Sequence, residues 1–145
     1  MDVRVWGVIE DRLIELRFEP ATGEPGLRIV GLPEDRVGTT ADRVRAALLN
    51  SGLMGEVPPA VIRLEPVVRA GSASDLDLAI ALAILGGVGS IGQDVRWVLA
   101  TGRLGPDGTV LARGLGERLT LADVLGSLCH TRVLGFEHMF GKHGA

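Results

Sequence analysis

Apolar and polar residues alternate with a period of two near the start of the chain. The alternation runs through Val3–Ile9 and again through Leu13–Glu19, with Glu10-Asp11-Arg12 between the two segments. A period of two is typical of strands with one buried face. We therefore predict two strands joined as a hairpin. A loop rich in proline and glycine follows at Pro20–Gly26, and Leu27–Val30 makes a third short strand.

Helical spacing of apolar residues begins further along, at about Thr40–Ser51. We start the helix there because Gly38 interrupts the run that follows Pro33, and Gly52 suits a C-terminal cap. The predicted apolar stripe consists of Ala41, Val44, Ala47 and Leu48. A strand is then predicted over Val61–Val68, where apolar and charged residues alternate again.

A second helix is predicted to start within Gly71–Asp77. It is apolar on every side from Leu78 to Leu85, so we expect it in the core. A turn at Pro106-Asp107-Gly108 predicts a hairpin between Trp97–Gly102 and Thr109–Ala112. A third helix is predicted over residues 116–128, with an apolar stripe of Leu119, Leu121, Ala122 and Leu125. The hairpins exclude an all-parallel sheet, so the predicted class is α+β, with one domain over residues 1–128 and a tail over 129–145.

Composition limits the classes of function. The 145 residues suit one domain, and 46% of them are hydrophobic, which excludes disorder for most of the chain. The net charge is −3, so the chain lacks the excess of basic residues that is typical of domains whose main function is to bind nucleic acid. With Cys129 as its one cysteine and no apolar leader, the chain is expected in the cytoplasm. Its longest apolar run, Leu78–Leu85, is too short to span a membrane.

Several short motifs occur together in a characteristic order. They are Ile29-Val30-Gly31-Leu32-Pro33, Arg43–Leu48, Asn50-Ser51-Gly52, Gly71–Leu76, Gly102, Asp107-Gly108 and Arg113-Gly114. In order and spacing they resemble the N-terminal domain of the ComM/YifB family of bacterial proteins, which are often labelled magnesium-chelatase-like. The resemblance implies a Lon-protease-like fold, related to the second domain of a small-subunit ribosomal protein, with a mixed sheet and helices packed on one side.

In full-length members of that family this domain precedes an AAA+ motor that forms a ring and acts in DNA branch migration. ATP hydrolysis by such a motor needs a phosphate-binding loop that ends in lysine and serine or threonine. The one lysine here, Lys142, is followed by His143, and the glycine-rich segment Gly86–Gly92 has no lysine. We expect no ATPase activity and no cofactor.

Catalysis of the Lon type uses a serine at the start of the buried helix and a lysine base. The resemblance places the serine equivalent at Ala73, which has no nucleophile. The flanking Ser72 and Ser74 are three residues before Asp75 and Asp77, a spacing that favours helix capping over catalysis. We therefore predict a degenerate site and no enzyme, with a serine hydrolase using Ser72 or Ser74 as the alternative.

Metal binding is not expected either. Cys129 and His130 are sequence neighbours whose side chains generally point apart, and one cysteine with three histidines does not make a closed zinc site. Asp75 and Asp77 diverge on a helix, so we interpret them as capping or solvated acids.

Binding is the function that remains. Arg36, Arg43 and Arg45 cluster around the first helix, and Arg63 lies in the following strand, so these four are candidate contact residues. Nearby acids neutralise much of their charge, which favours a self-paired, solvated face over a nucleic-acid groove. Trp6 and Trp97 lie in predicted strands, where we expect core packing.

The interpretation we favour is a non-catalytic Lon-like module that associates with itself or with a separate partner such as an AAA+ ATPase. A DNA-binding accessory domain is a further alternative.

Overall fold

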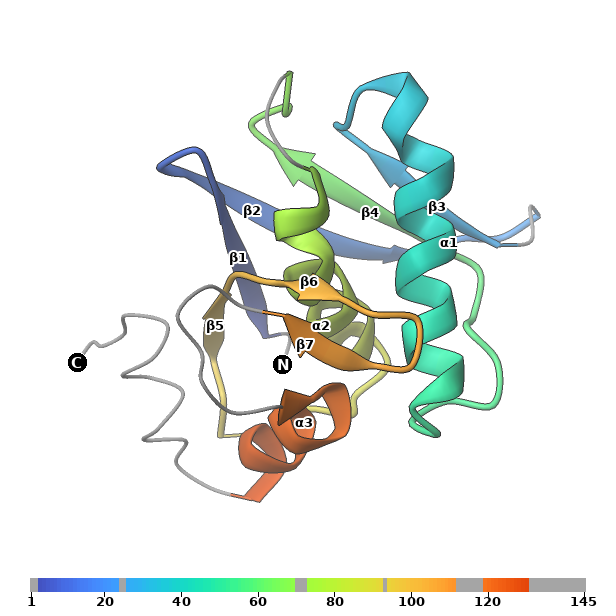
Figure 1. The fold of residues 1–145 in the computed structure, drawn as a ribbon, viewed down its shortest axis with the longest axis vertical. Coiled ribbons are helices and arrows are strands. Elements are labelled where there is room, and N and C mark those ends of the chain that lie inside the picture. The colour runs from blue at the N-terminus through green and yellow to red at the C-terminus, as the bar shows by residue number, and fades with distance from the viewer. Residues whose placement is uncertain (1–2, 24–25, 70–72, 93, 112–118, 131–145) are drawn as a thin grey trace.

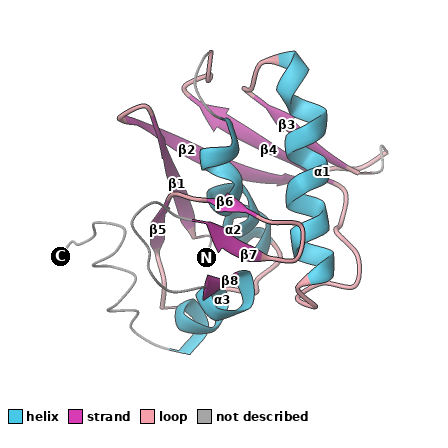
Figure 2. Ribbon diagram, in the orientation of Figure 1, coloured by secondary structure: helices cyan, strands magenta, loops and turns pink. Residues whose placement is uncertain are grey.

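A computed structural model describes residues 3–23, 26–69, 73–92, 94–111 and 119–130. Strands and helices interleave along the chain, which confirms the predicted α+β class (Figure 2). The elements are β1 (Arg4–Ile9), β2 (Arg12–Pro20), β3 (Leu27–Val30), α1 (Glu34–Asn50), β4 (Ala60–Glu65), the 3₁₀ helix η1 (Ala73–Leu76), α2 (Asp77–Gly87), β5 (Trp97–Ala100), β6 (Arg103–Leu104), β7 (Thr109–Leu111), β8 (Leu119–Thr120) and α3 (Leu121–His130).

The main sheet has five strands in the order β3-β4-β2-β1-β5. Strand β2 runs antiparallel to both β1 and β4, whereas the β3–β4 and β1–β5 pairs are parallel. The predicted hairpin of β1 and β2 is confirmed. Its two-residue turn places Glu10 and Asp11 at φ 50° and 62°, the positive values that tight hairpin turns require.

Both long helices lie on the same side of this sheet, and a second sheet with the order β6-β7-β8 lies on that side as well (Figure 1). Strand β6 contacts both α1 and α2. Helix α2 is therefore enclosed, and each of its residues Asp77–Leu85 is buried. The prediction of a core helix is confirmed. The opposite face of the five-stranded sheet, called the open face below, is not covered by any helix or strand of the described residues.

The first helix begins earlier than the sequence pattern predicted. It starts at Glu34, directly after Pro33, and Gly38 lies inside it. Glu34 and Asp35 in the first turn interact favourably with the positive end of the helix. One glycine costs an exposed helix interior only about 1 kcal/mol, which those interactions and the packing of the rest of the helix offset. The buried stripe includes Thr40 along with the predicted Val44, Ala47 and Leu48.

The prediction of a hairpin between Trp97–Gly102 and Thr109–Ala112 is wrong for the first of these two segments. Strand β5 pairs with β1 in the large sheet, and the short β6 is the strand that pairs with β7. Gly102, at φ 146°, separates β5 from β6, and the turn at residues 106–108 closes the shorter hairpin. The fourth strand also ends early, at Glu65, because Pro66 follows it and has no N–H to donate to the sheet.

The third helix begins at Leu121 within a reciprocal capping arrangement. The N–H of Asp123 donates to Oγ1 of Thr120 at 3.1 Å, and the N–H of Thr120 donates to Oδ2 of Asp123 at 3.0 Å. Its buried residues are Leu121, Val124, Leu125 and Leu128, whereas Ala122, which we had placed in the stripe, is exposed. Residues 116–118 of the predicted helix and the tail from residue 131 onward lie outside the described residues.

Within the described part of the chain, no helix combines the length and the apolar character needed to cross a membrane.

Candidate functional site at the start of the buried helix

The start of α2 is the place where the predicted degenerate site lies. Ala73 is the first residue of η1, and only 3% of its surface is exposed. Ser74 and Asp75 in the same 3₁₀ turn are half-buried, and Ser72 lies outside the described residues. The methyl group of Ala73 is therefore enclosed by the fold.

Two glycines fix the start of α2 against the sheet. The N–H of Gly102 donates to the carbonyl of Asp75, and the carbonyl of Gly102 accepts from the N–H of Leu78, both at 3.1 Å. A Cβ at Gly7 of β1 would lie 2.7 Å from Cδ2 of Leu76. Only a residue without a side chain allows this approach between β1 and the helix entrance.

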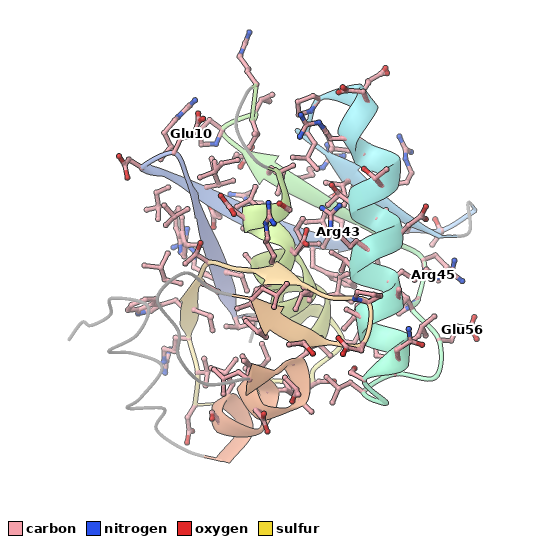
Figure 3. All side chains as sticks on the ribbon, in the orientation of Figure 1. Glu10, Arg43, Arg45 and Glu56 are labelled. Atoms are coloured by element: carbon pink, nitrogen blue, oxygen red, sulfur yellow. The ribbon has the colours of Figure 1, made fainter. Side chains whose placement is uncertain are left out.

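The main polar feature of this region is an ion pair between α1 and α2. Asp77 is fully buried, and its carboxylate accepts two hydrogen bonds from the guanidinium of Arg43. Nε of Arg43 lies 2.8 Å from Oδ2, and Nη2 lies 2.9 Å from Oδ1. The N–H of Leu104 in β6 donates to Oδ2 at 3.2 Å, and Nη2 of Arg43 also reaches Oγ1 of Thr40 at 3.4 Å. Figure 3 shows Arg43 on the side of α1 that faces α2.

This geometry corrects the interpretation of Asp77. It does lie in the first turn of α2, and the capping role predicted for Ser74 and Asp77 stays a prediction. Asp77 is not solvated, however, because the fold buries it completely. Its carboxylate instead joins three elements, namely α1 through Arg43, α2 through its own backbone, and β6 through Leu104.

Burial and pairing act in opposite directions on the Asp77 carboxyl. Burial raises the pKa of Asp77 above its ordinary value, because the charged form loses contact with water. The hydrogen bonds from Arg43 and Leu104 lower it again, as does the positive charge of Arg103. For the partner, the hydrogen bond to Asp77 raises the pKa of the Arg43 guanidinium, and the loss of water opposes this shift.

Chemically, both oxygens of Asp77 are occupied by donors. A general base needs a lone pair directed at a substrate proton, and the described contacts direct these lone pairs at Arg43 and Leu104. The ion pair between Arg43 and Asp77 therefore has a structural role, because it fixes the position of α1 relative to the start of α2. Among the described residues, no three side chains of the metal-binding types gather closely enough to hold an ion.

The sequence contains a signal for this pair that the apolar pattern concealed. Asp77 is followed at once by eight buried apolar residues on a helix without a polar side, so its charge requires a buried partner. Arg43 lies three residues after the buried Thr40 and next to Val44, which places it on the inner side of α1.

The four candidate arginines do not form one surface. Arg43 points inward, whereas Arg45 lies on the outer side of α1 and is exposed, as Figure 3 shows. Arg36 is exposed near the start of α1, with its Nε 4.0 Å from Oδ2 of Asp35. Arg63 lies on the open face of the sheet, where it binds Glu19 at 3.0 Å. Arg36 lies near an acid of its own helix turn, as predicted, whereas Arg43 pairs with the buried Asp77 and not with a solvated acid nearby in sequence.

The two tryptophans are also placed differently from the prediction. Trp97 in β5 is 43% exposed, and Trp6 in β1 is half-buried. Strand β1 directs Val5 and Ile9 into the core, so the alternating Trp6 lies on the open face. In β1 the alternating apolar residues are the buried ones, and Trp6 falls in the other set, so its apolar character alone did not indicate core packing.

Cys129 and His130 end α3, and their side chains lie outside the described residues.

The chain therefore forms a small α+β domain in which a buried ion pair joins two helices on one side of a mixed sheet. A sequence comparison identifies its family. The model of the family described as subunit ChlI of Mg-chelatase matches residues 15–120. The chain belongs to this family, and its similarities to YifB and ComM make it an N-terminal ChlI-like domain of the ComM/YifB family.

The chain is similar to several curated proteins. It is 31% identical over 107 residues to an uncharacterized protein of Mycobacterium tuberculosis, covering 70% of this chain and 20% of that protein. It is 43% identical over 72 residues to the uncharacterized protein YifB of Escherichia coli, covering 50% and 14%. It is 32% identical over 77 residues to the competence protein ComM of Haemophilus influenzae, covering 53% and 15%. The matches thus span a fifth or less of each relative.

Proposed function

We propose that this chain is a non-catalytic association module of Lon-like fold, which binds a second copy of itself or a separate protein such as an AAA+ ATPase. The mixed sheet with both long helices on one side supports the Lon-like assignment. Membership of the ChlI family supports a domain that works together with other parts of a larger assembly, since the matched relatives are much longer than this chain.

The start of α2, where Ala73 is buried and Asp77 is hydrogen-bonded to Arg43 and Leu104, is the observation that carries the non-catalytic part of the proposal. A serine peptidase needs an exposed nucleophile within hydrogen-bond reach of a base. Here the residue that the resemblance aligns with that serine is Ala73, which is buried, and the buried acid Asp77 is held by Arg43 and Leu104. The polar groups of this region therefore stabilise the domain. Association with a protein partner is the function that we propose for it.

The cellular setting is proposed by analogy. The relative in Haemophilus influenzae is named a competence protein, and we extend a role near DNA processing in the cytoplasm from that relative to this chain. The charge of −3 and the internal pairing of Arg43 and Arg63 favour contact with proteins over direct contact with DNA.

Light scattering coupled to size-exclusion chromatography tests association directly. We expect the mass to exceed that of one chain and to fall on dilution, because association follows mass action. If the chain stays monomeric at high concentration and also fails to bind the AAA+ ATPases purified from the same cell, the proposal is wrong.

Activity-based labelling tests the alternative of a hydrolase. A fluorophosphonate probe reacts with activated serines, and we expect no labelling that depends on Ser74 or Ser72. Labelling of the wild-type chain that is lost in Ser74→Ala or Ser72→Ala would overturn the non-catalytic assignment. Ser51, whose hydroxyl donates to the carbonyl of Leu48 at 2.9 Å, offers a matched control as Ser51→Ala.

A further inference from the structure

The open face of the five-stranded sheet has two distinct zones. One zone, on β1 and β5 and at the start of β2, is apolar, and the other, on β2 and β4, is charged. The strand register places Trp97 opposite Arg4 and Leu99 opposite Trp6. It also places Val8 opposite Leu13. The apolar zone consists of Trp6, Val8, Leu13, Trp97 and Leu99, and each of these side chains is at least partly exposed.

The apolar zone has the composition of a protein interface. Trp97 and Leu13 are among the most exposed large hydrophobic residues of the described chain. Arg4 lies beside them, with its guanidinium carbon 5.6 Å from the centre of the Trp6 ring. Tryptophan and arginine are among the residues most often found at the energetic centre of protein interfaces.

The charged zone forms bands of opposite sign across the strands. Arg17 lies opposite Arg63 on β2 and β4, and two residues along the same strands Glu15 lies opposite Glu65. Ion pairs cross between neighbouring rows, from Arg17 to Glu65 at 3.5 Å, from Arg4 to Glu15 at 3.1 Å and from Arg63 to Glu19 at 3.0 Å. These three arginines and three glutamates sum to zero charge.

Such a face is complementary to itself. A two-fold axis that runs between the row of Arg17 and Arg63 and the row of Glu15 and Glu65, parallel to both, lays these two arginines of one copy over these two glutamates of the other. The same operation places Trp6 over Arg4 of the second copy and Trp97 over its Leu99, because each of these pairs is two residues apart on one strand. Two sheets can pack face to face about 10 Å apart, which allows both zones to meet at once.

We propose that the open face is the surface through which two copies of this chain associate, sheet on sheet. The inference rests on the proposed association function and names its surface and its partner. A polyanion is a poorer match, because Arg4, Arg17 and Arg63 are each already paired with a glutamate of the same face. An isologous dimer uses the same patch on both copies, and the banded charges satisfy that requirement.

Tryptophan fluorescence can report directly on burial of the open face. It contains two tryptophans and no tyrosine, and both tryptophans lie on the open face. We expect the emission of the wild-type protein to shift to the red on dilution, over the same concentration range in which the mass from light scattering falls. A dimer built on another surface would change its mass without this shift.

Substitution at the face locates the interface. We expect Trp97→Glu to raise the dissociation constant at least about tenfold, because it removes an exposed aromatic side chain from the proposed interface and adds an unpaired charge. Leu111→Glu is the matched control, since Leu111 is 53% exposed in β7 of the other sheet, and its effect should stay within about twofold. Circular dichroism of both variants checks that each is folded.

The outcomes separate this inference from the proposed function. Association that persists in Trp97→Glu and is lost in Leu111→Glu overturns the open face as the interface and leaves the association function intact. A wild-type chain that is monomeric at every concentration overturns both the inference and self-association. Tryptophan quenching by a thymidine oligonucleotide in a monomeric, salt-sensitive complex would assign the face to single-stranded DNA and overturn the dimer.

Discussion

The two faces of the five-stranded sheet use the same chemistry in different surroundings. On the covered side, Arg43 binds the fully buried Asp77 through two hydrogen bonds. On the open face, Arg63 binds Glu19 at a similar distance, but both side chains are about half exposed. Comparing the two shows that the contact distance alone does not determine what an ion pair contributes to stability.

Water explains the difference. An exposed pair gains little from its attraction, because water screens the charges and both side chains lose freedom when they are held together. A buried pair has already lost its hydration, so the removal of one partner leaves an uncompensated charge inside the protein. We therefore expect that loss of the covered pair strongly lowers the free energy of unfolding. Loss of an open-face pair should change it very little.

Arg43→Met should have the largest effect. It retains the length of the side chain but leaves the Asp77 carboxylate without its guanidinium, a change that typically costs 3–5 kcal/mol. We expect about 3 kcal/mol, at the lower end, since 31% of the Arg43 side chain is exposed and water can partly replace it. Urea denaturation of the variant and of wild type measures the difference. A loss below about 1 kcal/mol would mean that the pair is no stronger than an exposed one.

The pH dependence of Arg43→Met is the next test of the comparison. Burial raises the pKa of Asp77, and the variant lacks the guanidinium that lowers it, so the folded-state pKa lies further above the unfolded-state value. Between these two values the folded state binds more protons, so the free energy of unfolding falls as the pH rises. The variant should be most stable in acid and lose stability as the pH rises through the folded-state pKa. Denaturation at a series of pH values checks the sign against the double variant Arg43→Met/Asp77→Asn.

Gly7→Ala tests how tightly the covered face is packed. The added methyl group would lie 2.7 Å from Cδ2 of Leu76 and 3.2 Å from Cβ of Ala79, and both neighbours are fully buried. Overpacking of this kind usually costs about 1–3 kcal/mol. Thermal unfolding measures the change, and a variant as stable as wild type would show that the start of α2 can move away from β1.

Gly38→Ala should act in the opposite direction, because it lies away from both faces of the sheet. It lies inside α1, and an added Cβ would have no atom within 4 Å. Replacing a helix-interior glycine with alanine stabilises by about 0.5–1 kcal/mol, since the unfolded chain loses freedom and the helix gains propensity. The same thermal assay detects the rise, and a decrease would mean that the glycine has a packing role.

Arg63→Met should have the smallest effect. It removes the exposed pair with Glu19, and exposed pairs are worth about 0–1 kcal/mol. Measured beside Arg43→Met, it is the matched control for the buried pair. If both variants lose the same free energy, burial does not distinguish the two faces.

Local patterns were sufficient to predict several elements. The β1–β2 hairpin follows from period-two alternation around Glu10-Asp11, and α2 follows from a run of apolar residues with no polar side. Both signals lie within short stretches of sequence. The α+β class follows from the order of such elements, and it did not require knowledge of which strands pair.

Features that depend on distant contacts could not be predicted in this way. The partner of Asp77 lies 34 positions away, and although the spacing from Thr40 and Val44 places Arg43 on the inner side of α1, no short-range pattern links it to Asp77. Trp97 and Thr109 flank a strong turn, but β5 pairs with β1 because the edge of the large sheet was available there. Strand β5 reads Trp97-Val98-Leu99-Ala100 and has no polar position, so its sequence does not indicate that Trp97 lies on the open face.

The parallel pairing of β1 with β5 has a consequence for how the chain is made. Residues 4–7 find their second neighbour only in residues 97–100, so the chain up to residue 100 must leave the ribosome before β1 is flanked on both sides. Until then the hairpin presents an unprotected strand edge, which is the kind of template that binds other nascent chains. Slow synthesis through this interval would prolong the exposure, and a chaperone bound to β1 would shorten it.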